Sequence, residues 1–442
     1  MDTGRLLIIV LVCSIAAASP SRAQMSGQTV RHHRVAEQEP DRYLVPAVIQ
    51  AEKALDLRDF ITAENKLRHV VSDDDQNYRA WFDLGYLYTA TGRDADAISA
   101  YRKSVAAKPD LFESNLNLGI MLGETGQLDE AEKYLRAATK LKPSGSPEHG
   151  QERAWLSLAH VLESKNPQEA VAGYAEAVKL EPSDPEPHLA AGSLLENQRR
   201  FADAEREYKE AADLDPKSVE AVAGLVNVYT KTERLPEAEK MLRRYIELNP
   251  ENATAHVQLG RVLAARGNPA DAKTEYEAAL KLSPNDFEAR RELADIDAAN
   301  GKFAQAAKEY QALVTKRPKD PDLHYALGNA LMRSRNFPAA QQVLLETVKL
   351  KADMGPAYND LALAASENKQ YELAIRALDA RAKYEPESAG TYFLRATCYD
   401  NLKAAKLAAE NYRHFLELAQ GKFPDQEWQA KHRLMAIDPT NK

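Results

Sequence analysis

The sequence predicts an all-α protein made of stacked copies of one helical hairpin. Two residues recur along the 442-residue chain, an alanine and a large residue four positions later, and a proline usually follows the second helix. The pair occurs eleven times, at intervals of 34 residues with one of 39, as Ala63/Leu67, Ala97/Tyr101, Ala131/Leu135, Ala170/Tyr174, Ala204/Tyr208, Ala238/Leu242, Ala272/Tyr276, Ala306/Tyr310, Ala340/Leu344, Ala374/Leu378 and Ala408/Tyr412. A small residue lets two helices approach closely and a large one fills the neighbouring gap, so the pair indicates a repeated helix crossing.

Residues 78–111 show the hairpin most clearly. Apolar or small side chains share one face of each of two predicted helices: Trp81, Leu84, Gly85 and Tyr88 on the first, and Ala97, Tyr101 and Ser104 on the second. Gly92 supplies the left-handed conformation that lets the first helix end and the chain turn back. Pro109 stops the second helix because it has no amide hydrogen. A hairpin of this size cannot bury its apolar faces alone, so the copies must stack.

This pattern resembles the tetratricopeptide repeat (TPR) family over about nine tenths of the chain. The period matches, as do Trp at the fourth place of the repeat, Leu-Gly at the seventh and eighth, and Ala at the twentieth. The resemblance implies a right-handed α-solenoid of about eleven repeats plus a C-terminal capping helix. It also implies a protein that holds partners in a concave groove lined by the first helices.

The predicted organisation follows the register of the repeat. Residues 44–77 are expected to form a degenerate N-terminal cap, 78–145 two repeats and 152–422 eight more. Residues 146–151 interrupt the register and are expected to form an inserted loop. Residues 423–442 are expected to be a capping helix and tail that cover the end of the array, as terminal units of solenoids do. Its packing face is predicted to hold Trp428, Leu434 and Met435.

Residues 1–23 have the pattern of a secretory signal peptide. Arg5 precedes the apolar stretch 6–18, and Ser21-Arg22-Ala23 provides a small-x-small cleavage site. The apolar stretch is shorter than the roughly 20 residues that a spanning helix needs. We therefore expect an exported, periplasmic or envelope-associated protein without a membrane span after cleavage, with an uncleaved N-terminal anchor as the alternative. Residues 24–43 are polar and expected to be a flexible linker.

Charge and cysteine content exclude further classes. The 58 basic and 66 acidic residues give a net charge of −8 and are mixed along the chain, without the basic stripe that a nucleic-acid binder needs. The two cysteines are Cys13 and Cys398, and signal cleavage removes the first. No intramolecular disulfide is then possible. We expect no nucleic acid partner, and Cys398 as a small buried residue.

The repeats contain no recognisable catalytic or metal-binding motif. HExxH, GxSxG, a phosphate-cradling glycine loop and a CxxC pair are all absent from the mature sequence. His188, His256 and His324 recur every 68 residues at the fourth place of their repeats, where Trp81 and Trp155 occur in others. They are therefore expected to pack in the core rather than to share a metal. The sequence predicts no catalytic residue, no cofactor and no metal.

The TPR resemblance also assigns a partner-binding surface. In that family the second, fifth, ninth and twelfth residues of the first helix face the groove. The early groove is then apolar and the later groove polar, with Phe82, Tyr86, Leu116, Ile120, Arg261, Arg291, Tyr325 and Asn329 as the candidate binding residues. The alternatives are that the cap or linker covers the apolar patch, and that Arg261 and Arg291 are solvated surface charges rather than a grip for a carboxylate.

These observations favour a non-catalytic scaffold that binds a protein or peptide, serving envelope assembly or secretion. One alternative is a hydrolase that acts on envelope polymers through an unrecognised site. Arg291 with Asp295, one helical turn apart, is the nearest approach to an acid–base pair. The other alternative is a solenoid that binds a glycan or a small molecule.

Overall fold

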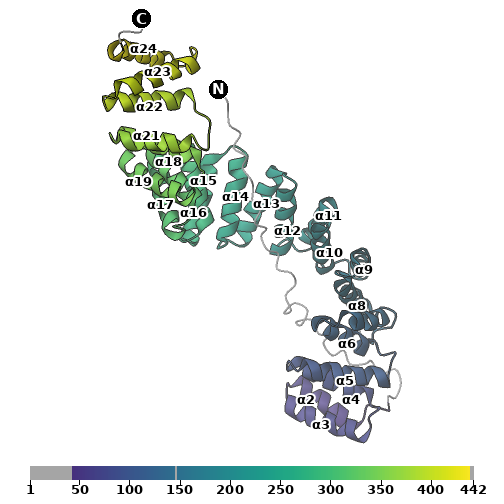
Figure 1. Cartoon of the computed structure of the whole chain (residues 1–442). Helices are drawn as coiled ribbons and strands as arrows, with labels where there is room; N and C mark the ends of the chain where they lie inside the picture. Colours follow the sequence, from purple (N-terminus) through teal and green to yellow (C-terminus); the bar gives the residue numbers. More distant parts are fainter. Residues whose placement is uncertain (1–41, 145–146, 439–442) are drawn as a thin grey trace. The chain divides into compact units, whose positions relative to one another are not determined.

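The computed structural model describes residues 42–144 and 147–438, within which there are 23 α-helices and no β-strand. The expected signal peptide, and all of the expected linker except Arg42 and Tyr43, lie outside these residues. The chain forms two compact units, divided between Pro250 and Glu251. Each unit consists of consecutive helical hairpins, whose helices carry labels in Figure 1 where there is room.

The N-terminal unit contains six hairpins. Their helices are α2 (Pro46–Asp56), α3 (Phe60–Asp73), α4 (Tyr78–Ala90), α5 (Asp94–Ala107), α6 (Phe112–Glu124), α7 (Leu128–Ala138), α8 (Pro147–Leu162), α9 (Pro167–Leu180), α10 (Glu186–Asn197), α11 (Phe201–Leu214), α12 (Val219–Lys231) and α13 (Leu235–Leu248). Each helix packs against its neighbours in the sequence, and the first helices of several successive hairpins also touch. This nearest-neighbour packing is typical of a solenoid.

The C-terminal unit contains five hairpins and a closing helix. Its helices are α14 (Ala253–Ala265), α15 (Pro269–Leu282), α16 (Phe287–Ala299), α17 (Phe303–Lys316), α18 (Pro321–Arg333), α19 (Phe337–Leu350), α20 (Gly355–Glu367), α21 (Tyr371–Arg381), α22 (Ala389–Asn401), α23 (Ala405–Ala419) and α24 (Pro424–Ile437). The predicted count of eleven hairpins and one capping helix is confirmed.

The repeated alanine and its large partner form the core of every hairpin. All eleven alanines have no exposed surface, and all eleven large residues are at most 6% exposed. The glycine of the Leu-Gly pair faces the large residue of its own hairpin. A β-carbon at Gly260, for example, would lie 2.5 Å from Cε1 of Tyr276, and one at Gly85 equally close to Tyr101. The family pattern thus has a steric cause, because the ring occupies the place of a side chain.

Ten of the eleven described hairpins have a left-handed residue at the fifteenth place, and only the shorter turn between α8 and α9 has none. Gly92 has a φ of 72°, as predicted. In six other repeats the same place is taken by residues that are not glycine, with φ between 56° and 64°: Arg58, Arg199, Glu233, Arg335, Lys369 and Lys403. A side chain makes this conformation unfavourable by roughly 1–2 kcal/mol. The packing of the hairpins therefore holds these residues in a left-handed conformation that their side chains make unfavourable.

Replacing Lys369 with glycine should stabilise the C-terminal unit by about 0.5–1 kcal/mol. Glycine removes the steric cost of the positive φ, and its greater freedom in the unfolded chain offsets part of that gain. Chemical unfolding followed by circular dichroism measures the change. Lys308→Gly, in the exposed middle of α17, is the matched control and should instead destabilise by about 1 kcal/mol. A Lys369→Gly protein less stable than the wild type would contradict the claim that the positive φ of Lys369 lowers stability.

The loop expected at residues 146–151 needs correction. From residue 147 onward these residues are helical and form the start of α8, which spans 16 residues, whereas most first helices span 13. Gly150 makes this extension possible, because a β-carbon there would lie 2.8 Å from Cγ of Pro143. The extra residues therefore lengthen a helix instead of forming a loop.

The predicted packing face of the closing helix also needs correction. Ala430 is fully buried, and Leu434 and Ile437 pack with it against the core at the end of the C-terminal unit. Trp428 and Met435 are 64% and 61% exposed. Trp428 and Ala430 are two positions apart, so they point to nearly opposite sides of the helix. Leu434 is the one predicted packing residue that the structure confirms.

Candidate partner-binding site

The four residues of the predicted early groove lie in one apolar cluster. Phe82 and Tyr86 on α4 are partly buried and pack against the core that contains Leu116 and Ile120 of α6. The ring of Phe82 lies 5.8 Å from that of Tyr101. Leu116 and Ile120 are buried, so Phe82 and Tyr86 are the two members of the set that retain accessible surface.

The two arginines of the later groove are engaged within the C-terminal unit. Arg261 on α14 lies 2.6 Å from a carboxylate oxygen of Glu292 and 3.1 Å from one of Glu288, both on α16. Arg291 lies 3.9 Å from Asp295 in its own helix. Any carboxylate from a partner must compete with these groups. The structure thus ties the two arginines to different carboxylates instead of bringing them to one anion.

Tyr325 and Asn329 on α18 converge on a residue that sequence reasoning missed. Nδ2 of Asn329 donates a hydrogen bond of 3.0 Å to Asp360 on α20. Burial, and then the neighbouring Asp360 carboxylate, raise the pKa of Tyr325 to about 12. Asp360 holds the sixth place of its repeat, next to the fifth place that faces the groove in this family. The family's groove positions therefore did not select it.

Asp295, which with Arg291 was the nearest approach to an acid–base pair, is partly occupied by a contact with the core of its own hairpin. Burial raises the pKa of Asp295, and the Tyr310 hydroxyl donates a hydrogen bond of 2.5 Å to its carboxylate. Tyr310 is the large core residue of that hairpin. Asp295 therefore anchors a packing residue in place.

Two of the three recurring histidines, His188 and His256, form polar pairs between the two helices of their hairpins. Nδ1 of His188 lies 2.8 Å from Glu207, and Nδ1 of His256 lies 2.7 Å from Glu275. The bond from His188 lowers the pKa of Glu207, against the effect of burial. His324 has no such partner and bonds the Pro318 carbonyl. The expectation of core packing is thus refined, since these side chains are partly buried and the first two are paired with acids.

Several core tyrosines also bond acids that the sequence did not single out. The Tyr208 hydroxyl donates a hydrogen bond of 3.0 Å to Glu196. In the same way, Tyr174 donates to Glu163 and Tyr412 donates to Asp400. Each acid holds the twelfth place of its repeat. The sequence carries this signal, because acids occur at that place only in repeats whose large core residue is tyrosine.

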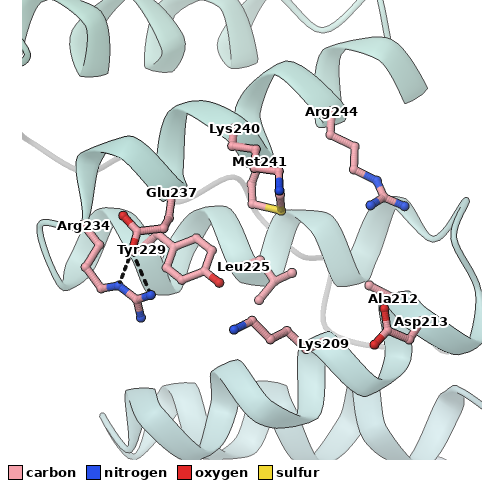
Figure 2. Close-up of a pocket in the computed structure, with 10 residues that line it drawn as sticks. All are labelled: Lys209, Ala212, Asp213, Leu225, Tyr229, Arg234, Glu237, Lys240, Met241 and Arg244. Atoms are coloured by element: carbon pink, nitrogen blue, oxygen red, sulfur yellow. Dashed lines mark hydrogen bonds and ion pairs between the residues drawn. The ribbon is translucent and has the colours of Figure 1, made fainter.

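A cavity of about 350 Å³ opens between α11, α12 and α13 in the N-terminal unit. Figure 2 shows its ten lining residues. Ala212, Leu225, Tyr229 and Met241 form an apolar floor, and charged side chains form the rim: Lys209 and Asp213 from α11, and Arg234, Glu237, Lys240 and Arg244 from α12–α13. The repeat pattern of the sequence did not predict this cavity.

One end of the cavity is closed by a cluster around Glu205. Its carboxylate accepts from the Tyr229 hydroxyl at 3.0 Å and lies 2.7 Å from Lys209 and 2.6 Å from Arg234. Burial opposes its ionisation, but these three hydrogen bonds together hold the pKa of Glu205 below its ordinary value. The Arg234 guanidinium also lies over the Tyr229 ring, 4.6 Å from its centre.

The same cluster recurs where α3, α4 and α5 meet. Glu64 accepts from Tyr88 at 3.2 Å and from Arg93 at 3.0 Å, and Arg93 lies over the Tyr88 ring at 4.1 Å. The repeat places are identical to those around Glu205. This arrangement therefore joins one hairpin to the next, and Lys209 and Arg234 have a structural role.

Two further observations concern the described residues only. Within residues 42–144 and 147–438, no helix is both long and apolar enough to cross a membrane. The same residues hold no group of three or more His, Cys, Asp or Glu side chains arranged to bind a metal ion.

The fold and the spacing of its core residues define a helical-hairpin repeat protein. Family models described as tetratricopeptide repeat match residues 194–259, 257–321, 292–357 and 325–383. A further model, the middle TPR-like domain of cilia and flagella-associated protein 70, matches residues 50–181. The chain belongs to the tetratricopeptide repeat family, and its repeats indicate a protein–protein interaction scaffold.

Individual relatives match parts of the chain. Over 134 residues it is 31% identical to the protein O-mannosyl-transferase Tmtc1 of Drosophila melanogaster, covering 29% of this chain and 15% of that protein. The solved structure of YrrB, described as a TPR protein with an unusual peptide-binding site, is 26% identical, with a TM-score of 0.38 over 42% of this chain and 95% of its own. The Pseudomonas aeruginosa protein pilF is 19% identical, with a TM-score of 0.37, and the match covers 48% of this chain and 97% of the pilF chain.

Proposed function

We propose that this protein is an exported, non-catalytic scaffold that holds an extended peptide or a protein surface in the groove lined by its first helices, and that it serves the assembly of an envelope or secretion complex. The observation that carries the proposal is the aromatic pair Phe82 and Tyr86, which retains accessible surface on one apolar cluster of adjacent repeats. Export rests on the signal-peptide pattern of residues 1–23.

Aromatic side chains supported by a packed core are suited to anchor a peptide. Their rings supply a large contact area at little cost in conformational entropy, and such residues dominate the energy of many interfaces. Behind Phe82 and Tyr86, Leu116 and Ile120 give a rigid floor. The partner class that fits is therefore a segment with apolar side chains.

Within the C-terminal unit, the polar groove residues supply selectivity for a partner segment that binds there. Arg261, Glu288 and Glu292 present a bonded set of charges, and Tyr325 and Asn329 surround Asp360. A partner with matching charges gains new bonds here, whereas a mismatched one leaves buried charges unpaired.

Affinity capture with residues 24–442 from the native envelope fraction, followed by mass spectrometry, tests the proposal. We expect Phe82→Ala with Tyr86→Ala to reduce recovery of the captured partner at least tenfold, with an unchanged helical circular dichroism spectrum. The control is Leu57→Ser with Ile61→Ser, which removes apolar side chains that are 81% and 78% exposed outside the groove. Equal recovery by the wild type and the Phe82/Tyr86 variant would contradict the groove assignment.

A further inference from the structure

We propose that the cavity between α11, α12 and α13 is a second binding site, which takes an acidic peptide segment of a partner protein with one apolar side chain inserted. The site does not depend on the groove. Leu225 and Tyr229 line the cavity, whereas Ala223 and Asn227 hold the fifth and ninth places of α12, which face the groove in this family. Residues two apart on a helix point about 200° away from each other.

The floor of the cavity suits one apolar side chain. Ala212, Leu225 and Tyr229 are buried, and Met241 is partly buried above them. Methionine adapts its shape to irregular contacts, which favours a site that accepts a side chain from outside. A volume of about 350 Å³ is near the lower end of the range for ligand sites. It is sufficient for a side chain and its backbone.

Two cations on the α13 rim have no acid of their own. Lys240 and Arg244 lie one helical turn apart, and neither forms an ion pair with any residue that the structure describes. Arg244 donates a hydrogen bond of 2.8 Å to the Pro216 carbonyl, which fixes its guanidinium beside the cavity. Like charges one turn apart repel each other. Apart from the bond of Arg244 to Pro216, the fold therefore gains no ion pair from these two cations, and an anion from outside would relieve their repulsion.

The other charged groups of the rim decide where that anion goes. Lys209 and Arg234 are occupied by Glu205, and Arg234 also pairs with Glu237 at 2.9 Å. Figure 2 shows this pair at one end of the cavity, with Arg244 well away from it. Asp213, on the α11 side, repels a carboxylate. Acidic groups of a partner are thus directed to Lys240 and Arg244.

The combination of floor and rim selects the class of ligand. A bare inorganic anion would use the cations and leave the apolar floor in water. Nucleic acid needs an extended basic surface, and this chain carries a net charge of −8. An acidic peptide with a leucine-like side chain uses both features, because burial of the side chain and charge-assisted bonds then act together.

Fluorescence polarisation with the protein of residues 24–442 tests this inference. The probe is a short, end-blocked, fluorescein-labelled peptide in which one leucine is flanked on both sides by acidic residues. We expect saturable binding that Lys240→Glu and Arg244→Gln each weaken about tenfold, as for loss of a charged hydrogen bond. Lys308→Glu is the matched control, since Lys308 holds the same repeat place in an exposed part of α17. It should change binding less than twofold.

A second set of measurements distinguishes the cavity from the groove and from a simple anion site. Replacing the leucine of the probe by serine should weaken binding about tenfold, and Phe82→Ala with Tyr86→Ala should leave it unchanged. Absence of saturable binding by the wild type, equal loss in Lys308→Glu, equal binding of the serine peptide, or displacement by millimolar phosphate would each overturn the inference. A dimer in sedimentation velocity that Lys240→Glu abolishes would also overturn it, by assigning the cavity to a second copy of this chain.

Discussion

Replacing Tyr208 by alanine should lower the free energy of unfolding by about 3–5 kcal/mol, as expected for a buried aromatic side chain. The ring is 2% exposed and lies between two helices. A β-carbon at Gly192 of its own hairpin would be 2.8 Å from the ring, and one at Gly224 of the next hairpin would be 2.5 Å from its Cε1. Tyr208 therefore joins two repeats, and its removal leaves a cavity at their boundary.

The measurement for Tyr208→Ala is native-state hydrogen exchange of α10, α11 and α12, because a repeat array need not unfold in one step. The control is Tyr208→Phe, which keeps the ring and loses the hydrogen bond to Glu196. That loss should cost only about 1 kcal/mol, since Lys231 still bonds Glu196 at 2.7 Å. If alanine proves as mild as phenylalanine, the ring does not fill the boundary as described.

Replacing Gly224 by alanine should destabilise the same boundary by about 1–3 kcal/mol. The added methyl group meets the ring of Tyr208, which is held between its neighbours and has little room to move. The matched control is Gly390→Ala in α22, where the nearest atom, Ser388 Oγ, is 3.9 Å away. That change should be neutral or slightly stabilising, because alanine favours a helix. Chemical unfolding of both variants measures the difference, and equal effects would contradict the overpacking.

The fold was predictable because its determinants repeat. Each alanine and large residue of the pattern is buried, and each hairpin appears where the register places it. Exceptions arose where the register gives no information. The start of α8 depends on the contact of Gly150 with Pro143, and the outward direction of Trp428 depends on which face of α24 meets α23.

The candidate site was less predictable than the fold. The groove positions of the family selected Phe82, Tyr86, Leu116 and Ile120, which do lie in one cluster; their binding of a partner stays a prediction. These positions gave no information about charge pairing, which decides the state of Arg261, and they overlooked Asp360 beside Tyr325. The cavity at α11–α13 was beyond sequence reasoning. Its rim residues come from two repeats and hold places where the pattern sets no residue type.

A double-mutant cycle on Tyr208 and Gly224 tests most directly whether large second-helix residues interlock successive hairpins. We predict that Gly224→Ala costs about 1–3 kcal/mol in the wild type but about zero, or a slight gain, when Tyr208 is already alanine. The coupling energy then approaches the whole cost of the glycine replacement. Additive effects of the two substitutions would contradict the interlocking of the repeats on which the groove and the cavity both depend.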